Sequence, residues 1–186
     1  MEHVSLDGVM QHESGEGFEY SGWTTPYRCA DGLSAVLEAQ GTHIDLLLGR
    51  KTYDSWSGYW PKAGDSPMAD ALNTATKYVA THRPNSLEWG PFNDLGVDIA
   101  ASIRELKLTE GPDLIVWGSS TVIALLLNEG LVDELILMVY PVLLGQGKRF
   151  FLDTADGRQL EFISCKTTST GVLVNTYQYV GKLQKG

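Results

Sequence analysis

Cysteine is scarce in this sequence of 186 residues. Its two cysteines, Cys29 and Cys165, are too few for a disulfide framework, and they do not have the spacing of metal ligands. The residues therefore predict neither a disulfide-stabilised extracellular fold nor a metal centre. Both thiols are expected to be small side chains of the core, because unpaired cysteines are usually buried.

Long hydrophobic runs are also missing. A membrane-spanning helix needs about 18 apolar residues in succession, and the longest candidate, residues 131–144, is interrupted by Asp133 and Glu134. The first residues, MEHVSLDG, have neither the basic region nor the apolar core of a signal peptide. A cytoplasmic protein without a membrane partner is therefore expected.

Positive charge is in short supply. The 14 lysines and arginines are outnumbered by 23 acidic residues, and the formal net charge is -9. This balance argues against nucleic acid or an anionic membrane as a partner, so an anionic ligand would be held locally by a few basic groups and backbone donors. Hydrophobic residues make up 43% and charged residues 20% of the chain, which is typical of a globular protein. One domain over residues 1–186 is expected.

Short apolar runs alternate with helical patterns along the chain. Apolar runs bounded by glycine or polar residues predict strands, and apolar residues three and four apart predict helices. Strands are expected at 1–6, 44–48, 77–80, 114–117, 134–142, 160–166 and 172–180, and helices at 27–40, 68–74, 98–108 and after the glycines at 49 and 118. Residues 11–22 and the segment around residues 89–92 are expected to be loops. This order predicts an α/β fold with a largely parallel sheet, and residues 169–171 predict an antiparallel C-terminal hairpin.

The stretch 113–127, DLIVWGSSTVIALLL, contains the turn around which the chain is organised. A buried strand leads into Gly118, which permits a tight turn, and Ser119 or Ser120 can cap the following helix. Free amides and the positive end of the helix dipole would point out of this turn, which favours an anion such as phosphate. The alternative is a plain strand–helix connection.

Two further strand ends have the same character. Arg50 and Lys51 start a helix directly after Gly49, where cations oppose the helix dipole, so they are expected to face phosphate or to form a solvated basic pair. Thr81, His82 and Arg83 end another strand and would suit a phosphate ester or an ordinary polar loop. Ligands of parallel sheets bind at the carboxyl ends of strands, so these corners and the Asp7 turn are expected to line one cleft.

Several motifs together resemble the dihydrofolate reductase-like superfamily. They are VSLDGVM, LLLGRKTYDSW, KYVATHR, DLIVWGSSTVIALLL, GLVDELILMVYPVLLGQGKRFF and the final hairpin. Within the superfamily the chain most resembles the branch related to the reductase domain of the riboflavin-biosynthesis deaminase-reductase. The resemblance extends from Val4 to about Val180 and implies a three-layer α/β/α fold with a mostly parallel central sheet.

The resemblance implies NADPH binding and hydride transfer. In the family, the G-R-x-T motif meets cofactor phosphates, the end of the third strand cradles the adenosine 2′-phosphate, the glycine turn before the late helix holds the pyrophosphate, and the D-G turn lies against the nicotinamide. The corresponding residues are Asp7, Gly8, Gly49, Arg50, Lys51, Thr52, Thr81, His82, Arg83, Trp117, Gly118, Ser119, Ser120 and Thr121. Here the glycine turn is Gly-Ser-Ser in place of Gly-Gly, and the first strand is shorter than usual.

The substrate ring would lie against Trp23, Tyr53 and Trp56, although these aromatics could equally be core. True dihydrofolate reductases have an acid two residues after the proline of a W-x-x-P motif, and here Arg28 occupies that place. A guanidinium stays protonated and cannot assist pterin protonation, but it can bind a carboxylate or phosphate. Asp31, one helical turn further on, is the candidate replacement for the acid, or a solvated carboxylate.

The expected protein is an NADPH-dependent reductase of a small heterocyclic or ribosylated substrate other than dihydrofolate. Two alternatives stay open: the 5-amino-6-(5-phosphoribosylamino)uracil reductase of riboflavin synthesis, and an NADPH-binding protein without turnover. A homodimer is expected because residues 134–151 and the hairpin form an apolar, strand-rich edge that needs cover, and because related domains are commonly dimers.

Overall fold

The structure, a computed structural model, describes residues 1–13, 17–151 and 157–184. Contacts within the chain define two compact units. The first unit comprises Met1–Ala39 and Val132–Gly186, and the second comprises Gln40–Leu131. The expectation of one domain over residues 1–186 stays a prediction.

The second unit is built on a parallel four-stranded sheet. Strand β2 (Ile44–Gly49) lies between β3 (Lys77–Ala80) and β5 (Asp113–Val116), and β4 (Phe92–Asp94) pairs with the outer side of β3. The continuous apolar run of β2 is explained by this central place, because five of its six residues are buried. The carboxyl ends of β2, β3 and β5 therefore meet at one edge of the sheet.

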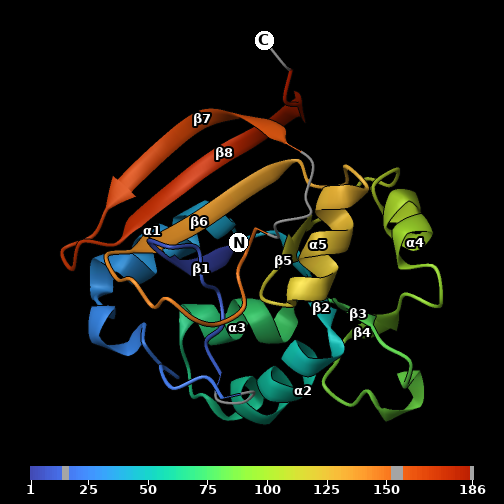
Figure 1. Cartoon of the computed structure of the whole chain (residues 1–186). Helices are drawn as coiled ribbons and strands as arrows, with labels where there is room; N and C mark the ends of the chain where they lie inside the picture. Colours follow the sequence, from blue (N-terminus) through green and yellow to red (C-terminus); the bar gives the residue numbers. More distant parts are fainter. Residues whose placement is uncertain (14–16, 152–156, 185–186) are drawn as a thin grey trace. The chain divides into compact units, whose positions relative to one another are not determined.

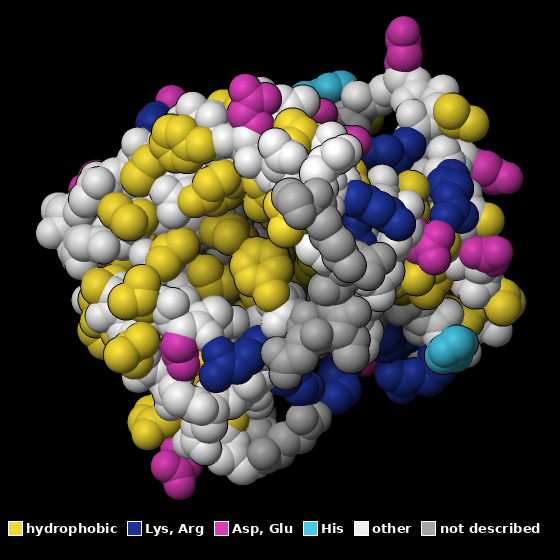
Figure 2. Space-filling model, turned by 45° about the horizontal axis from the view of Figure 1, so that its top comes forward, with side chains coloured by type: hydrophobic (Ala, Val, Ile, Leu, Met, Phe, Trp, Pro, Cys, Tyr) yellow, Lys and Arg dark blue, Asp and Glu magenta, His cyan; other side chains and the backbone are white. Residues whose placement is uncertain are grey.

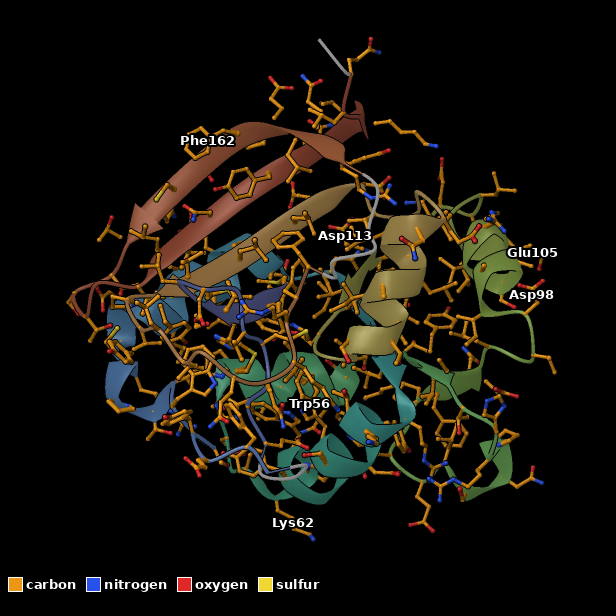
Figure 3. All side chains as sticks on the ribbon, in the orientation of Figure 1. Trp56, Lys62, Asp98, Glu105, Asp113 and Phe162 are labelled. Atoms are coloured by element: carbon orange, nitrogen blue, oxygen red, sulfur yellow. The ribbon has the colours of Figure 1, made fainter. Side chains whose placement is uncertain are left out.

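The helices of the second unit follow the strands in sequence (Figure 1). They are α2 (Arg50–Tyr59), α3 (Pro67–Thr74), α4 (Ile99–Leu106) and α5 (Ser120–Asn128), with short 3-10 turns η2 (Trp60–Lys62) and η3 (Pro84–Ser86). Two of them start with side-chain caps, as Ser66 Oγ accepts from the Ala69 amide and Asp98 Oδ1 accepts from the Ala101 amide. Asp98 and Glu105 are labelled near the start and end of α4 in Figure 3. The capping of this helix by Asp98 is confirmed.

The first unit contains the mixed sheet. Strand β1 (Glu2–Ser5) pairs in parallel with β6 (Glu134–Tyr140), and β8 (Leu173–Lys182) lies antiparallel between β6 and the outer strand β7 (Arg158–Thr167). Figure 1 shows β6, β8 and β7 side by side as three long strands. Helix α1 (Ala30–Gln40) follows the 3-10 turn η1 (Thr25–Tyr27). The α/β fold with parallel strands and an antiparallel C-terminal hairpin is confirmed.

Some sequence predictions need correction. Helix α1 begins at Ala30 and not at residue 27, because Arg28 has extended backbone angles that end the preceding turn. Strand β4 overlaps the segment around residues 89–92, for which the sequence predicts a loop. All three of its residues are exposed, so the strand leaves no apolar pattern in the sequence. Cys165 is exposed and Cys29 is half-buried, so neither thiol belongs to the core. Residues 14–16 of the predicted loop 11–22 lie outside the described residues.

Apolar side chains remain exposed on the outer strands of the first unit. Phe162 on β7 is 59% exposed and Ile163 is 49% exposed. Figure 2 shows hydrophobic side chains gathered over much of the face that it presents, and Figure 3 labels Phe162 on β7. None of the helices in the described ranges has the length and apolar character needed to span a bilayer.

Candidate functional site

Three strand ends come together in the second unit. The glycine turn after β5 and the glycine turn after β2 are in direct contact, because the Gly49 amide donates to Ser119 Oγ over 2.7 Å. The end of β3 joins them through Arg50 at the start of α2, whose NH1 lies 3.5 Å from Thr81 Oγ1. The parallel order of the strands produces this meeting, since β2 has β3 on one side and β5 on the other. Asp7 belongs to the first unit, and a cleft lined by all four corners stays a prediction.

The Gly118–Ser119 turn is unusual in its backbone. Both residues have positive φ, 60° at Gly118 and 65° at Ser119. A Cβ on Gly118 would lie 3.2 Å from Thr52 Oγ1, and one on Gly49 would lie 2.9 Å from Ser119 Oγ. A side chain at position 49 would displace Ser119 Oγ, and one at position 118 would combine a positive φ with a tight contact to Thr52, so both positions favour glycine.

Ser119 does not cap its own helix with its side chain, contrary to one of the sequence predictions. Its hydroxyl is turned to the neighbouring turn, where it accepts from the Gly49 amide and shares a 2.8 Å hydrogen bond with Thr52 Oγ1. Ser120 is the first residue of α5 and Thr121 is the second, so both lie in the first helical turn. The Ser119 side chain thus ties the start of α5 to the start of α2.

Two helix N-termini lie at this corner. Helix α2 starts at Arg50 and α5 at Ser120, and neither has an acidic residue in its first turn. The first-turn amides of a helix lack intrahelical partners, and the positive end of the dipole is not neutralised by a carboxylate here. This arrangement suits an anion.

The basic residues of the corner differ in their exposure to solvent. Arg50 donates four hydrogen bonds within the chain, and its side chain is 17% exposed. Lys51 and His82 are exposed. The Arg83 side chain is 65% exposed and lies 3.3 Å from Asp54 Oδ2. Arg83 is therefore better placed than Arg50 to receive a negatively charged group.

The aromatic candidates separate into core and surface. Tyr53 is 2% exposed, and its hydroxyl accepts from the amides of Glu88 and Trp89, so the core interpretation holds for this residue. Trp117 is buried and donates through Nε1 to Gln40 Oε1 over 3.0 Å. Trp56 is half-buried on α2 (Figure 3), with its ring 6.4 Å from that of Trp117. Of the three, Trp56 alone can offer part of its ring to a ligand.

In the first unit, Asp7 holds a loop. Its carboxylate accepts from Ser5 Oγ over 2.6 Å and from the amides of Leu144 and Gly145. These hydrogen bonds, with that of Ser5 the strongest, lower the pKa of Asp7 to about 2. Gly8, with φ 80°, accepts from the Phe150 amide through its carbonyl. Both predicted cofactor residues thus organise the segment after β6, and a contact with nicotinamide stays a prediction.

Asp31 is engaged with the β7–β8 hairpin. Its carboxylate accepts from the Ser169 amide over 2.6 Å and from Ser169 Oγ over 2.8 Å. Hydrogen bonds from the Cys29 thiol and from Ser169 lower the pKa of Asp31 to about 2. Both carboxylate oxygens are thus occupied by Ser169, and the role of Asp31 as the replacement acid stays a prediction.

Trp23 belongs to an aromatic cluster that sequence reasoning did not find. Its ring centroid is 5.0 Å from that of Tyr140, which is also 5.5 Å from Tyr27 and hydrogen-bonded to His3 Nδ1 over 2.9 Å. Burial raises the pKa of Tyr140 to about 12 and lowers that of His3 to about 3. Arg28 is exposed and has no ion pair within the described ranges. Tyr140 is the last residue of the apolar strand β6. No pattern in the residues around it indicates that it is the centre of an aromatic cluster.

The second unit is thus an α/β unit in which two helix starts and several basic residues meet at the carboxyl edge of a parallel sheet. The chain matches the model of the RibD C-terminal domain over residues 2–174, and it belongs to that family. The resemblance inferred from the sequence motifs is therefore confirmed.

Relatives and solved structures agree with this assignment. The chain is 32% identical over 184 residues to the uncharacterized protein YyaP of Bacillus subtilis, covering 96% of this chain and 92% of YyaP. It is 26% identical to YwjB of the same organism over 88% of this chain and 87% of YwjB. A solved structure of a protein from Shewanella sp. PV-4, named as a riboflavin biosynthesis protein, is 20% identical in sequence to this chain. The two structures have a TM-score of 0.66, and the match covers 96% of each chain. A pyrimidine reductase-like protein of Corynebacterium diphtheriae shares 13% identity and a TM-score of 0.62, covering 96% and 90%. These two structures show the same fold.

Proposed function

We propose that this protein is an NADPH-dependent reductase that transfers a hydride to a small heterocyclic or ribosylated substrate. Membership of the RibD C-terminal domain family supports a reductase of the riboflavin-pathway type. The observation that carries the proposal is the corner of the second unit. There two helix N-termini without acidic residues lie beside an exposed basic turn at His82 and Arg83.

The residues of this corner fit a dinucleotide with an extra phosphate. The first-turn amides of α2 and α5, which start at Arg50 and Ser120, are donors for a pyrophosphate. Arg83 would hold the 2′-phosphate of the adenosine, and a guanidinium forms its strongest hydrogen bonds with such groups. The bound cofactor would supply the hydride, so the chain's own task would be binding and orientation.

Dihydrofolate is not the expected substrate. Arg28 stands where dihydrofolate reductases have their acid, and a guanidinium can neither accept hydrogen bonds from a pterin nor donate a proton to it. Asp31 is poorly placed to substitute, because both oxygens of its carboxylate already accept hydrogen bonds from Ser169. An anionic substrate that pairs with Arg28 fits this end of the chain better.

The test is a substrate screen followed by one substitution. NADPH absorbance is followed with dihydrofolate, other pterins, 5-amino-6-(5-phosphoribosylamino)uracil, related ribosylaminopyrimidines and simple carbonyls. Consumption of NADPH with a ribosylated or heterocyclic compound, and little or none with dihydrofolate, is expected. Arg83→Ala should remove most of the preference for NADPH over NADH, worth roughly 1.5–3 kcal/mol.

Arg104→Ala provides the matched control, because Arg104 is an exposed arginine of the same unit that pairs with Glu129. Failure of the wild type to bind either dinucleotide would refute the proposed function. Binding without turnover of any compound would instead support a dinucleotide-binding protein that is not an enzyme. Brisk dihydrofolate reduction would show that the substrate assignment is wrong.

A further inference from the structure

Arg50 is held by the chain itself. Its Nε donates to Asp54 Oδ1 over 2.7 Å, and its NH1 donates to the Arg83 carbonyl over 2.8 Å. NH2 also lies 3.4 Å from the carbonyl oxygen of Ser86. Together with the contact to Thr81, these interactions engage all three nitrogens of the guanidinium.

The groups that Arg50 holds belong to one turn. In η3 the Ser86 amide and hydroxyl both donate to the Arg83 carbonyl, over 3.3 and 3.0 Å. The Arg83 amide donates to Thr81 Oγ1 over 3.0 Å, which closes the start of the turn. Arg50 is therefore hydrogen-bonded to the backbone of the turn that carries the Arg83 side chain.

Asp54 contacts the side chain of Arg83 as well as that of Arg50. Asp54 lies one helical turn after Arg50 on α2, with Oδ1 on Arg50 and Oδ2 3.3 Å from Arg83 NH2. The carboxylate thus lies between two guanidinium groups that would otherwise repel each other. Because Asp54 is 45% exposed and Arg83 65% exposed, this second contact is a weak one that a phosphate can replace.

We propose that Arg50 and Asp54 are positioning residues for Arg83, and that Arg50 acts on the cofactor through this turn and not as a phosphate ligand. The inference rests on the proposed function. A guanidinium has five N–H donors, and forked binding of a phosphate needs two of them on one side. To provide them, Arg50 would have to give up its hydrogen bonds to the carbonyls of Arg83 and Ser86. The Arg83 carbonyl would keep its donors in Ser86, but the Ser86 carbonyl would lose its Arg50 donor, and the turn would lose its link to α2.

A double-mutant cycle between Arg50 and Arg83 separates the two roles. The readout is the ratio of affinities for NADPH and NADH, and adenosine 2′,5′-bisphosphate serves as a probe of the 2′-phosphate alone. Arg50→Ala should lower the ratio by about tenfold in the wild type and cause no further loss in an Arg83→Ala background. Additive losses would show that Arg50 binds phosphate itself, and an unchanged ratio in Arg50→Ala would also overturn the proposal.

Two further measurements make the test sharper. Arg50→Lys should behave like Arg50→Ala, because one ammonium group cannot span two carbonyls and a carboxylate, whereas a direct phosphate ligand would be partly replaced by lysine. Amide hydrogen exchange at Ser86 and Leu87 should become faster in both variants without any ligand, and Arg104→Ala should leave it unchanged. Slow exchange in the Arg50 variants would refute the positioning role even if no dinucleotide binds. A wild-type protein that neither binds a dinucleotide nor turns over any of the compounds would refute the proposed function instead.

Discussion

Ser119 shows at the scale of one residue how hydrogen bonds maintain a strained backbone. It is the only non-glycine residue with positive φ among the residues described. An L-residue in the left-handed region costs about 1–2 kcal/mol, and such strain persists only where the surroundings over-determine it. Here the surroundings are the Gly49 amide and the Thr52 hydroxyl, which both bind Ser119 Oγ.

Two substitutions at Ser119 separate strain from hydrogen bonding. Ser119→Ala loses the hydroxyl and keeps the strain, so the free energy of unfolding should fall by about 1–3 kcal/mol. Ser119→Gly loses the hydroxyl but relieves the strain, and it should be about 1 kcal/mol less destabilised than the alanine variant. Urea unfolding measures both values, with the exposed Ser34→Ala as control. An alanine variant as stable as the wild type would contradict the account.

Lys77 is a second residue whose environment is unusual. It has no exposed surface, and its Nζ donates to the carbonyls of Asn73 and Gly90 over 2.7 and 3.3 Å. The ammonium also lies 4.3 Å from the centre of the Trp89 ring. Burial lowers the pKa of Lys77 from 10.5 to about 8, although the Asp45 carboxylate raises it in part.

The lowered pKa of Lys77 predicts how stability depends on pH. Between about pH 8 and 10.5 the unfolded chain binds the proton and the folded chain does not, so stability should rise with pH in this window. The gain relative to Lys77→Met should be on the order of 3 kcal/mol at most. Urea midpoints of both proteins across this range give the difference. A difference that stays constant would show that Lys77 has an ordinary pKa.

At the scale of elements, the β7–β8 hairpin is fastened to the start of α1. Asp31 accepts two hydrogen bonds from Ser169, and Thr170 Oγ1 donates to the Tyr27 carbonyl over 2.9 Å. Asp31→Ala should therefore speed amide exchange at Ser169. Since the pKa of Asp31 is lowered from 3.8 to about 2, its stabilising contribution is present above pH 3.8 and is lost as the pH falls toward 2.

This sign gives a direct check. The difference in unfolding temperature between wild type and Asp31→Ala should shrink as the pH falls from about 5 to about 2. Asp65→Ala is the control, because Asp65 is an exposed carboxylate of the second unit. A difference that grows in acid would mean that Asp31 is not held as a charged acceptor.

At the scale of the whole molecule, the outer strand β7 predicts self-association. It is ten residues long, lies at the edge of its sheet, and exposes Phe162 and Ile163. Long apolar edge strands pair readily with another chain. We expect a homodimer formed through this strand, and light scattering should give twice the chain mass of 20.4 kDa.

Phe162→Lys should shift the protein toward the monomer without unfolding it, because the side chain is 59% exposed. The exposed Val97→Lys, on the second unit, is the control. A wild-type protein that remains monomeric at micromolar concentration would contradict the expectation.

The sequence by itself determined most of the elements and the family. The apolar run of β2 and its following glycine predicted a buried strand and a helix start, because burial on both faces leaves a continuous hydrophobic signal. The Asp98 cap and the C-terminal hairpin could be read for similar local reasons. Strand β4 could not, since three exposed residues in an edge strand carry no pattern.

Only the tertiary structure decided which polar groups stay exposed and which are enclosed by hydrogen bonds within the chain. Arg50, Asp7 and Asp31 look like functional groups in the sequence, yet each binds residues far away in the chain, at separations of up to 138 positions. Arg83, an ordinary loop residue by composition, remains largely exposed at the same corner. Hydrogen bonds between distant segments depend on how strands are ordered in the sheet, and a local pattern of residue types does not specify that order.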